Sequence, residues 1–273
     1  MEPETLIYEV DGSIAIVTLN RPDLLNAWSR QMELEFRQVV YAAAGDDRVG
    51  AIVLTGAGKA FSAGGDKELL LKLARDGFTP ETAPPQFDVD PEQPIELQGR
   101  FSFLWGLAKP VICAINGAAA GVGFALAMYC DFRFAVPDAK LIAPFARLGL
   151  PAEQGLAWVL PQLVGVSAAT EILLTGRPVG AVEAKELGLV HRLFEPDSLI
   201  AETLAFATEL AAGTSQDSIQ MIKRQIYEGL GRGFGDALRL SENLTAEAVR
   251  RPDFREAVDA IHAKRRPRFK GKD

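Results

Sequence analysis

The sequence is poor in the residues that bind transition metals or act as thiol nucleophiles. Its 273 residues include two cysteines, Cys113 and Cys130, and two histidines, His191 and His262. The cysteines lie in apolar segments without a CxxC spacing, and the two histidines are far apart in the sequence. We therefore expect buried structural thiols, no metal site and no Cys/His nucleophilic pair.

Three further absences narrow the class of protein. The net charge of −7 speaks against a general affinity for nucleic acid, although the last ten residues, KRRPRFKGKD, hold six Lys or Arg and can meet a phosphate locally. The segment EPETLIYEV lacks a basic stretch followed by a short apolar run, so we predict no secretory signal and a cytoplasmic location. Residues 111–130 carry no charge, but Asn116 and three glycines interrupt them, and we expect a strand and a helix there rather than a membrane span.

The first half of the chain alternates between strand and helix patterns. Residues 5–10 and 14–19 are β-rich runs on either side of an Asp-Gly turn, which is a hairpin signal. Residues 49–56 and 110–116 are uncharged and mostly apolar, and they predict buried strands. Residues 76–99 contain five prolines and no apolar period, so we expect a long surface loop, either a lid or a solvated excursion.

The second half is predicted to be chiefly helical. The expected helices cover residues 153–164, 167–174, 181–187, 197–212, 215–229, 233–249 and 253–265. Alternating strands and helices followed by helices alone indicate an α/β core with a helical C-terminal part. We place the core at residues 1–195 and the helical region at residues 196–273.

Two segments share one design: a buried strand, a glycine-rich turn and the start of a helix. They are AIVLTGAGKAFSAGGD (51–66) and VICAINGAAAGVGFALA (111–127). Neither has the spacing of a nucleotide loop, because Lys59 is followed by Ala60 and the GxGxxG pattern is missing from both turns. A backbone without bulky side chains can direct N–H groups at an anion. Together the segments are candidates for an oxyanion hole, although either one alone is equally compatible with a plain tight turn.

The motifs KAFSAGGD (59–66), INGAAAGVGFALAMYCDFRFA (115–135) and LTGRPVGAVEAKELGLVHRLF (174–194) resemble those of the enoyl-CoA hydratase/isomerase (crotonase) superfamily. The likeness covers nearly the whole chain in the order of that family. It implies an α/β crotonase-like core of repeated ββα units with a helical C-terminal trimerisation region. It further implies a homotrimer or a dimer of trimers, and an acyl-CoA thioester substrate whose coenzyme A is no separate cofactor.

Matching the motifs position by position assigns roles to individual residues. The resemblance implies that the backbone N–H groups of Gly65 and Val122 bind the thioester oxygen, and that Lys264 contacts the coenzyme. The two glutamates that hydratases of this family use to activate water correspond here to Ala125 and Phe145. Neither side chain can carry a proton, so the paired-carboxylate chemistry of hydration is missing from its usual place.

A different acid is present nearby. The segment PFARLGLPAEQGLAWVLPQLVG (144–165) resembles the matching stretch of the 3-enoyl-CoA to 2-enoyl-CoA isomerases, with Glu153 at the position of their catalytic glutamate. The resemblance therefore favours isomerisation with a single base. Three alternatives stay open: a 2-enoyl-CoA hydratase in which Glu153 alone recruits water, a non-catalytic acyl-CoA-binding protein, and a purely structural Glu153 at a helix N-terminus.

Overall fold

Two sheets form the centre of the structure, a computed structural model that describes residues 3–87 and 94–269. The larger sheet has six strands in the order β1 (Leu6–Asp11), β2 (Ile14–Leu19), β3 (Ala51–Gly56), β5 (Val111–Ile115), β7 (Phe132–Ala135) and β10 (Arg192–Leu193). The smaller sheet has four, in the order β4 (Ala60–Ser62), β6 (Ala118–Ala120), β8 (Lys140–Ile142) and β9 (Pro178–Gly180). Strands β1 and β2 form the predicted antiparallel hairpin, and the other neighbours in the larger sheet are parallel.

One pattern of two strands and a helix repeats along the chain. Each repeat gives its first strand to the larger sheet and its second to the smaller one, and its helix follows. The repeats are β3-β4 with α2 (Lys67–Asp76), β5-β6 with α4 (Val122–Met128) and β7-β8 with α5 (Leu156–Thr175). The predicted core of ββα units is therefore confirmed. Because β4 and β6 are parallel neighbours, the turns that follow them emerge at the same edge of the smaller sheet.

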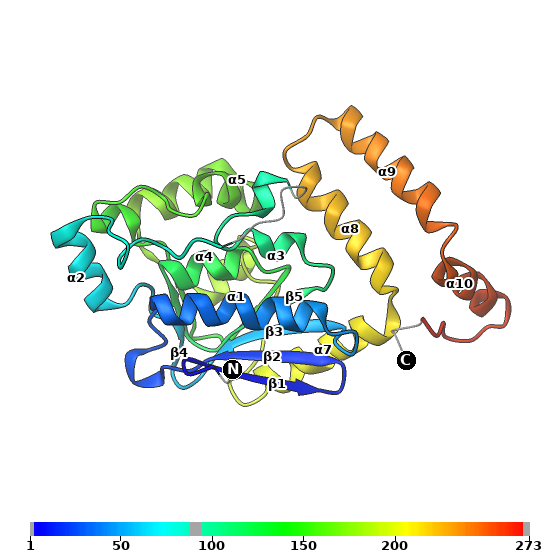
Figure 1. Ribbon diagram of the computed structural model, residues 1–273, viewed down its shortest axis with the longest axis horizontal. Coiled ribbons are helices and arrows are strands. Elements are labelled where there is room, and N and C mark those ends of the chain that lie inside the picture. Colours follow the sequence, from blue (N-terminus) through cyan, green and yellow to red (C-terminus); the bar gives the residue numbers. More distant parts are fainter. Residues whose placement is uncertain (1–2, 88–93, 270–273) are drawn as a thin grey trace.

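Helices cover both faces of the larger sheet. Helix α1 (Arg30–Gly45) lies along one face and α7 (Leu199–Gly213) along the other, as Figure 1 shows. Every residue of β3 and β5 is buried between these layers, which explains why both strands read as continuous apolar runs without alternation. Ser29 begins α1 by accepting a hydrogen bond from the Met32 N–H at 3.1 Å.

Short elements connect these layers. They are η1 (Pro22–Leu24), η2 (Ile95–Leu97), α3 (Phe103–Gly106), η3 (Phe145–Leu148) and α6 (Ala181–Glu186). The long loop predicted at residues 76–99 follows α2 and contains only η2 as regular structure among its described residues. Residues 88–93, which fall within that prediction, lie outside the described part of the chain.

Helix α5 is long and apolar enough, by length and composition alone, to cross a membrane. Its backbone is interrupted at Gly165, where φ is 76° and ψ is 162°, and Pro161 lies inside its first part. The two pieces match the helices predicted at residues 153–164 and 167–174, and each is shorter than the ~20 residues that span a bilayer. The uncharged segment 111–130 forms the predicted strand and helix in the core, and residues 118–120 of the glycine-rich turn form a second, short strand that was not predicted.

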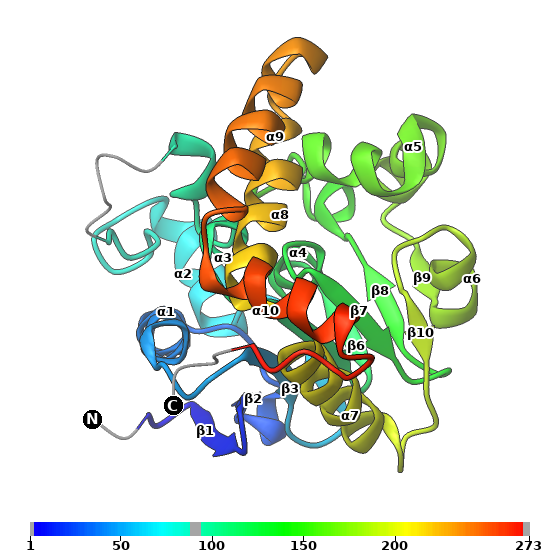
Figure 2. The ribbon, with the colours of Figure 1, turned by 90° about the vertical axis from the view of Figure 1, so that its right-hand side faces the viewer.

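Three helices at the end of the chain project from the sheets. These are α8 (Gln216–Gly229), α9 (Phe234–Ala248) and α10 (Pro252–His262), and Figure 2 shows α8 and α9 rising away from the core. Helix α9 packs on α8 through a small apolar cluster of Met221, Leu240 and Leu244. All three helices begin and end within a few residues of their predicted bounds.

Helix α8 is held to the core by the carboxylate of Asp131, which lies just before β7. The Lys223 ammonium pairs with Asp131 Oδ2 at 2.7 Å, and the Tyr227 hydroxyl donates to Oδ1 at 2.6 Å. The Val111 N–H also donates to Oδ2. The Lys223 and Asp131 side chains are less than one-tenth exposed, so this is a buried, fully hydrogen-bonded ion pair.

Removing the cation of this pair should loosen α8. We expect Lys223→Met to lower the free energy of unfolding by roughly 3–5 kcal/mol, because it leaves the Asp131 carboxylate buried without its counter-charge. Urea denaturation monitored by circular dichroism measures the change. Lys185→Met, at an exposed lysine on α6, is the matched control and should stay within about 0.5 kcal/mol of the wild type. Equal stability of both variants would contradict the anchoring role of the pair.

Candidate functional site

The two glycine-rich turns of the sequence meet in space. Gly64 follows β4 and Gly121 follows β6, with φ values of +99° and +51° that favour glycine. A Cβ atom built on Gly121 would lie 3.7 Å from the Gly64 Cα, so the two backbones are in direct contact. This contact places the residue after each glycine, Gly65 and Val122, side by side.

Neither of the two predicted N–H donors is used in the hydrogen bonds of a neighbouring strand or helix. In the bridge between Trp28 and Gly65, the hydrogen bonds run from the Trp28 N–H to the Gly64 carbonyl and from the Asp66 N–H to the Trp28 carbonyl. The Gly65 N–H is therefore not used by this bridge. Val122 is the first residue of α4, where an N–H has no acceptor within the helix. Within the described ranges, neither group has a hydrogen-bond acceptor.

Gly65, Val122 and Glu153 line one cavity of about 160 Å³, which we call the donor cleft. Its other walls come from the start of α1, from α2 and from the loop at residues 78–85. The three residues that the sequence singled out for chemistry are thus brought together, although they are distant along the chain. Their chemical roles remain predictions at this point.

Glu153 lies in the loop before α5, which begins at Leu156 and not at residue 153 as predicted. The Glu153 backbone carbonyl accepts a hydrogen bond from the Leu156 N–H at 3.0 Å. Its side chain is half-buried and has no hydrogen bond or ion pair with any residue in the described part of the chain. A carboxylate that caps no helical N–H is poorly explained as a helix-end group, and this one remains available to a ligand.

A hydrogen bond from the protein core holds the turn that contains Glu153. Gln154 has a positive φ of 54°, which is uncommon for a residue other than glycine. The buried Tyr129 hydroxyl donates a hydrogen bond to the Gln154 carbonyl. Burial raises the pKa of Tyr129 to about 12, so the phenol keeps its proton and remains a donor at neutral pH.

Apolar, buried residues occupy the two positions at which hydratases of this family have glutamates. Ala125 on α4 is fully buried, and Phe145 at the start of η3 is 2% exposed. Among the described residues, neither belongs to the lining of the donor cleft. No carboxylate from these two positions reaches the cleft, as the sequence predicted.

A second buried carboxylate in the donor cleft was missed by sequence reasoning. Glu33, on the first turn of α1, is 4% exposed and accepts hydrogen bonds from the Trp28 indole at 3.0 Å and from Arg100 Nε at 2.7 Å. A second nitrogen of the Arg100 guanidinium completes a bidentate pair. Arg100 is 67 positions away, so no local pattern pointed to this pair.

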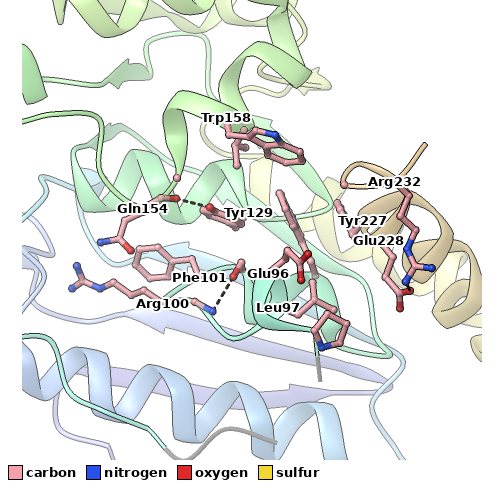
Figure 3. A pocket seen from close by; sticks show the side chains of 17 residues that line it. Glu96, Leu97, Arg100, Phe101, Tyr129, Gln154, Trp158, Tyr227, Glu228 and Arg232 are labelled. Carbon is pink, nitrogen blue, oxygen red and sulfur yellow. Dashed lines mark hydrogen bonds and ion pairs between the residues drawn. The ribbon is translucent and has the colours of Figure 1, made fainter. Parts of the chain in front are cut away.

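The donor cleft adjoins a larger cavity of about 530 Å³, drawn in Figure 3, which we call the aromatic pocket. Arg100 and Gln154 belong to the linings of both cavities, so the two meet at these side chains. The larger cavity has five aromatic side chains in its walls: Phe101, Trp105, Tyr129, Trp158 and Tyr227.

Lys264 is not brought to either cavity within one chain. It follows α10 with a φ of 51° and is exposed to solvent. Figure 1 shows helix α10 at the opposite end of the molecule from α2. Helix α2 contributes residues to the lining of the donor cleft. A contact between Lys264 and a coenzyme in this cleft would therefore require a neighbouring subunit, and the predicted role remains untested.

Metal-binding residues do not gather in the described structure. Among residues 3–87 and 94–269, no three His, Cys, Asp or Glu side chains are placed to hold one metal ion. Cys113 and Cys130 are buried and form no disulfide. The His191 Nδ1 accepts a hydrogen bond from the Arg133 backbone N–H at 3.1 Å, which is a structural use of the imidazole.

Comparison with known proteins identifies the family. The Enoyl-CoA hydratase/isomerase family matches residues 9–272, and the chain belongs to this family. It is similar to a probable enoyl-CoA hydratase of Rhizobium meliloti, with 35% identity over 99% of both chains. It is also similar to a 1,2-epoxyphenylacetyl-CoA isomerase of Escherichia coli, with 32% identity over 98% of this chain and 99% of the other. The protein is therefore an enzyme of a family that processes acyl-CoA thioesters.

Solved structures agree with this assignment. A crystal structure of an enoyl-CoA hydratase subunit from Geobacillus kaustophilus superposes with a TM-score of 0.86 at 32% identity, and all of both chains is covered. The expected crotonase-like fold is thus confirmed.

The ion pair between Glu33 and Arg100 should matter for stability. We expect Arg100→Met to lower the free energy of unfolding by about 3 kcal/mol, because Glu33 would stay buried without its cation. The double variant Glu33→Gln/Arg100→Met removes both charges and should recover much of the loss. Thermal and urea denaturation of both proteins measure the difference. If the single variant is as stable as the wild type, the pair does not form in solution.

Proposed function

We propose that this enzyme converts 3-enoyl-CoA thioesters to 2-enoyl-CoA thioesters, with Glu153 as the single base. The observation that carries the proposal is the position of Glu153, a half-buried carboxylate without a hydrogen-bond partner among the described residues, in the same cleft as two free backbone N–H groups. Glu81 also lines this cleft, but its side chain is exposed to solvent. The apolar Ala125 and Phe145 support a reaction that needs no second carboxylate.

The proposed reaction moves one proton and one double bond. The Glu153 carboxylate removes a proton from C2, and the electron pair of that C–H bond moves toward the thioester carbonyl. The N–H groups of Gly65 and Val122 bind the resulting dienolate oxygen, which carries the negative charge. The carboxyl group then returns the proton to C4, so the double bond shifts from C3–C4 to C2–C3. No water is consumed, and we propose that coenzyme A enters only as part of the substrate.

Hydration of 2-enoyl-CoA is the second candidate. Several relatives are named as probable enoyl-CoA hydratases, which favours this reaction. In this chain it would require Glu153 alone to orient and deprotonate water. Two other relatives are named isomerases, the epoxyphenylacetyl-CoA enzyme of Escherichia coli and a trans-2-decenoyl-[acyl-carrier-protein] isomerase of Streptococcus mutans, and their names support the first candidate.

We also propose that the enzyme is a cytoplasmic homo-oligomer, either a trimer or a pair of trimers. Large apolar side chains are exposed on its last two helices, including Phe234 at 83% and Ile261 at 76%. Apolar surface of this kind supports burial against further copies of the chain. In such an assembly Lys264 would be free to reach a neighbouring donor cleft.

Product analysis separates the two candidate reactions. We expect the enzyme to convert 3-hexenoyl-CoA to an isomer of equal mass and to leave crotonyl-CoA without the mass gain of one water. Liquid chromatography with mass spectrometry distinguishes the products. A gain of water on crotonyl-CoA, with no isomer from 3-hexenoyl-CoA, would replace the first candidate with the second.

The substitution Glu153→Gln tests the proposed base. Proton transfer by a positioned side chain contributes ~10²- to 10⁴-fold, so kcat for 3-hexenoyl-CoA should fall by at least ~10²-fold. The carboxylate has no partner among the described residues, so the melting temperature should barely change. Glu186→Gln, on the exposed side of α6, is the control and should retain full activity. Wild-type rates in Glu153→Gln would remove Glu153 from the mechanism, and unfolding would restore its structural interpretation.

A further inference from the structure

The aromatic pocket is the place where the acyl group would go if the thioester is bound as proposed above. The proposed reacting atoms lie in the donor cleft, and Arg100 and Gln154 line both this cleft and the aromatic pocket, so the two cavities are neighbours. In Figure 3 these two side chains lie at one side of the cavity, with Trp158 above and Glu228 and Arg232 at the far side. An acyl chain that leaves the cleft in this direction enters a space of about 530 Å³.

The walls of this pocket are flat and fixed in orientation. The Trp105 and Tyr227 rings stack with centroids 4.6 Å apart and planes 5° from parallel. The Tyr129 ring lies 4.7 Å from Trp105 at 49°, and 6.5 Å from Phe101. Phe101, Trp105 and Tyr129 are less than one-tenth exposed, so they cannot turn aside easily.

The polar ends of the two tyrosines are already used elsewhere. The Tyr129 hydroxyl donates to the Gln154 carbonyl, and the Tyr227 hydroxyl donates to Asp131 at 2.6 Å. Burial raises the pKa of both phenols, so neither becomes an anion at neutral pH. What these residues leave for a ligand is the apolar surface of their rings. Trp158 adds a large indole that is 45% exposed.

The far side of the pocket is charged. Arg232 pairs with Glu228 at 2.7 Å, and Glu228 also pairs with Arg224 at 2.6 Å. A long alkyl chain that crossed the pocket would meet this cluster and displace its water, which is unfavourable for charged groups. A short, broad apolar group would instead fill the space between the rings and stop before the charges.

We propose that the aromatic pocket selects acyl-CoA thioesters whose acyl group ends in an aromatic ring. The inference rests on the proposed binding of the thioester in the donor cleft, and it adds the substrate class. A ring among aromatic walls makes edge-to-face and offset contacts that an alkyl chain of equal carbon number does not make. It also loses less conformational freedom on binding than a flexible chain does.

Binding of saturated thioesters tests this class without any reaction. The ligands are 4-phenylbutanoyl-CoA and decanoyl-CoA, which have equal numbers of acyl carbons, with free coenzyme A as reference. Isothermal titration calorimetry on the wild-type protein should give a Kd for the phenyl thioester roughly tenfold below that of decanoyl-CoA. 4-Cyclohexylbutanoyl-CoA has a similar outline without π electrons and should fall between them. Equal or tighter binding of decanoyl-CoA would overturn the proposal.

A substitution at Trp158 tests whether the preference for the phenyl thioester arises in the aromatic pocket. We expect Trp158→Leu to reduce the preference for the phenyl thioester from tenfold to within about threefold, because it removes the one wall that is half-exposed. Tyr41→Leu, at a half-exposed aromatic residue of α1 outside both linings, is the matched control and should keep the full preference. An unchanged preference in Trp158→Leu would show that the ring binds elsewhere and would overturn the assignment.

The outcome is independent of the proposed reaction. These saturated ligands have no double bond to move, so an enzyme that fails to isomerise 3-hexenoyl-CoA can still show the phenyl preference. That combination would contradict the proposed function and leave the substrate class intact. Isomerisation of 3-hexenoyl-CoA together with a preference for decanoyl-CoA would support the proposed function and overturn the proposed substrate class.

Discussion

The close contact between the strand-turn segments of β4 and β6 is the constraint on which the site depends. A Cβ atom at Gly117 would lie 2.1 Å from the Lys59 carbonyl oxygen, well inside any tolerable contact distance. The parallel pairing of β4 with β6 and the absence of side chains at this contact let the two backbones touch. Only with the turns in this register do Gly65 and Val122 face one cleft, and the rest of the fold holds that register.

The two free N–H groups, the proposed base and the aromatic pocket come from different parts of the fold. Gly65 and Val122 follow strands β4 and β6 of the smaller sheet, whereas Glu153 lies in a loop whose Gln154 carbonyl accepts the hydrogen bond of Tyr129. Tyr227 comes from α8, and Asp131 ties that helix to the larger sheet. Removing one partner of a buried ion pair is strongly destabilising, because the other charge is left buried without compensation. We infer that the shape of the aromatic pocket depends on how firmly the C-terminal helices are docked.

Local patterns were sufficient to predict most of the helices and strands and the α/β class, whereas the arrangement in repeated ββα units was implied by the resemblance to the family. The apolar runs of β3 and β5, the glycine-rich turns and the break near Gly165 are all encoded within a few neighbouring residues. The pair of Glu33 with Arg100 and the five-ring pocket were not predictable, because they join segments that come together only after the sheets have formed. The start of α5 was misplaced by three residues, since the positive φ of Gln154 leaves no signature in a non-glycine residue.

Three carboxylates line the donor cleft, and their surroundings differ: Glu33 is buried, Glu153 is half-buried and Glu81 is exposed to solvent. Glu33 already accepts hydrogen bonds from Trp28 and from two nitrogens of Arg100, so a proton arriving there would have to displace a charged donor from a buried site. Glu153 lines the same cleft as Gly65 and Val122 and has no hydrogen-bond partner among the described residues, so a proton on its carboxylate would displace no donor. The number of acidic side chains in the cleft therefore says little about the reaction. Glu33 is engaged by buried donors, Glu81 faces solvent, and Glu153 is the half-buried carboxylate without a partner among the described residues, which supports the proposed reaction with a single proton carrier.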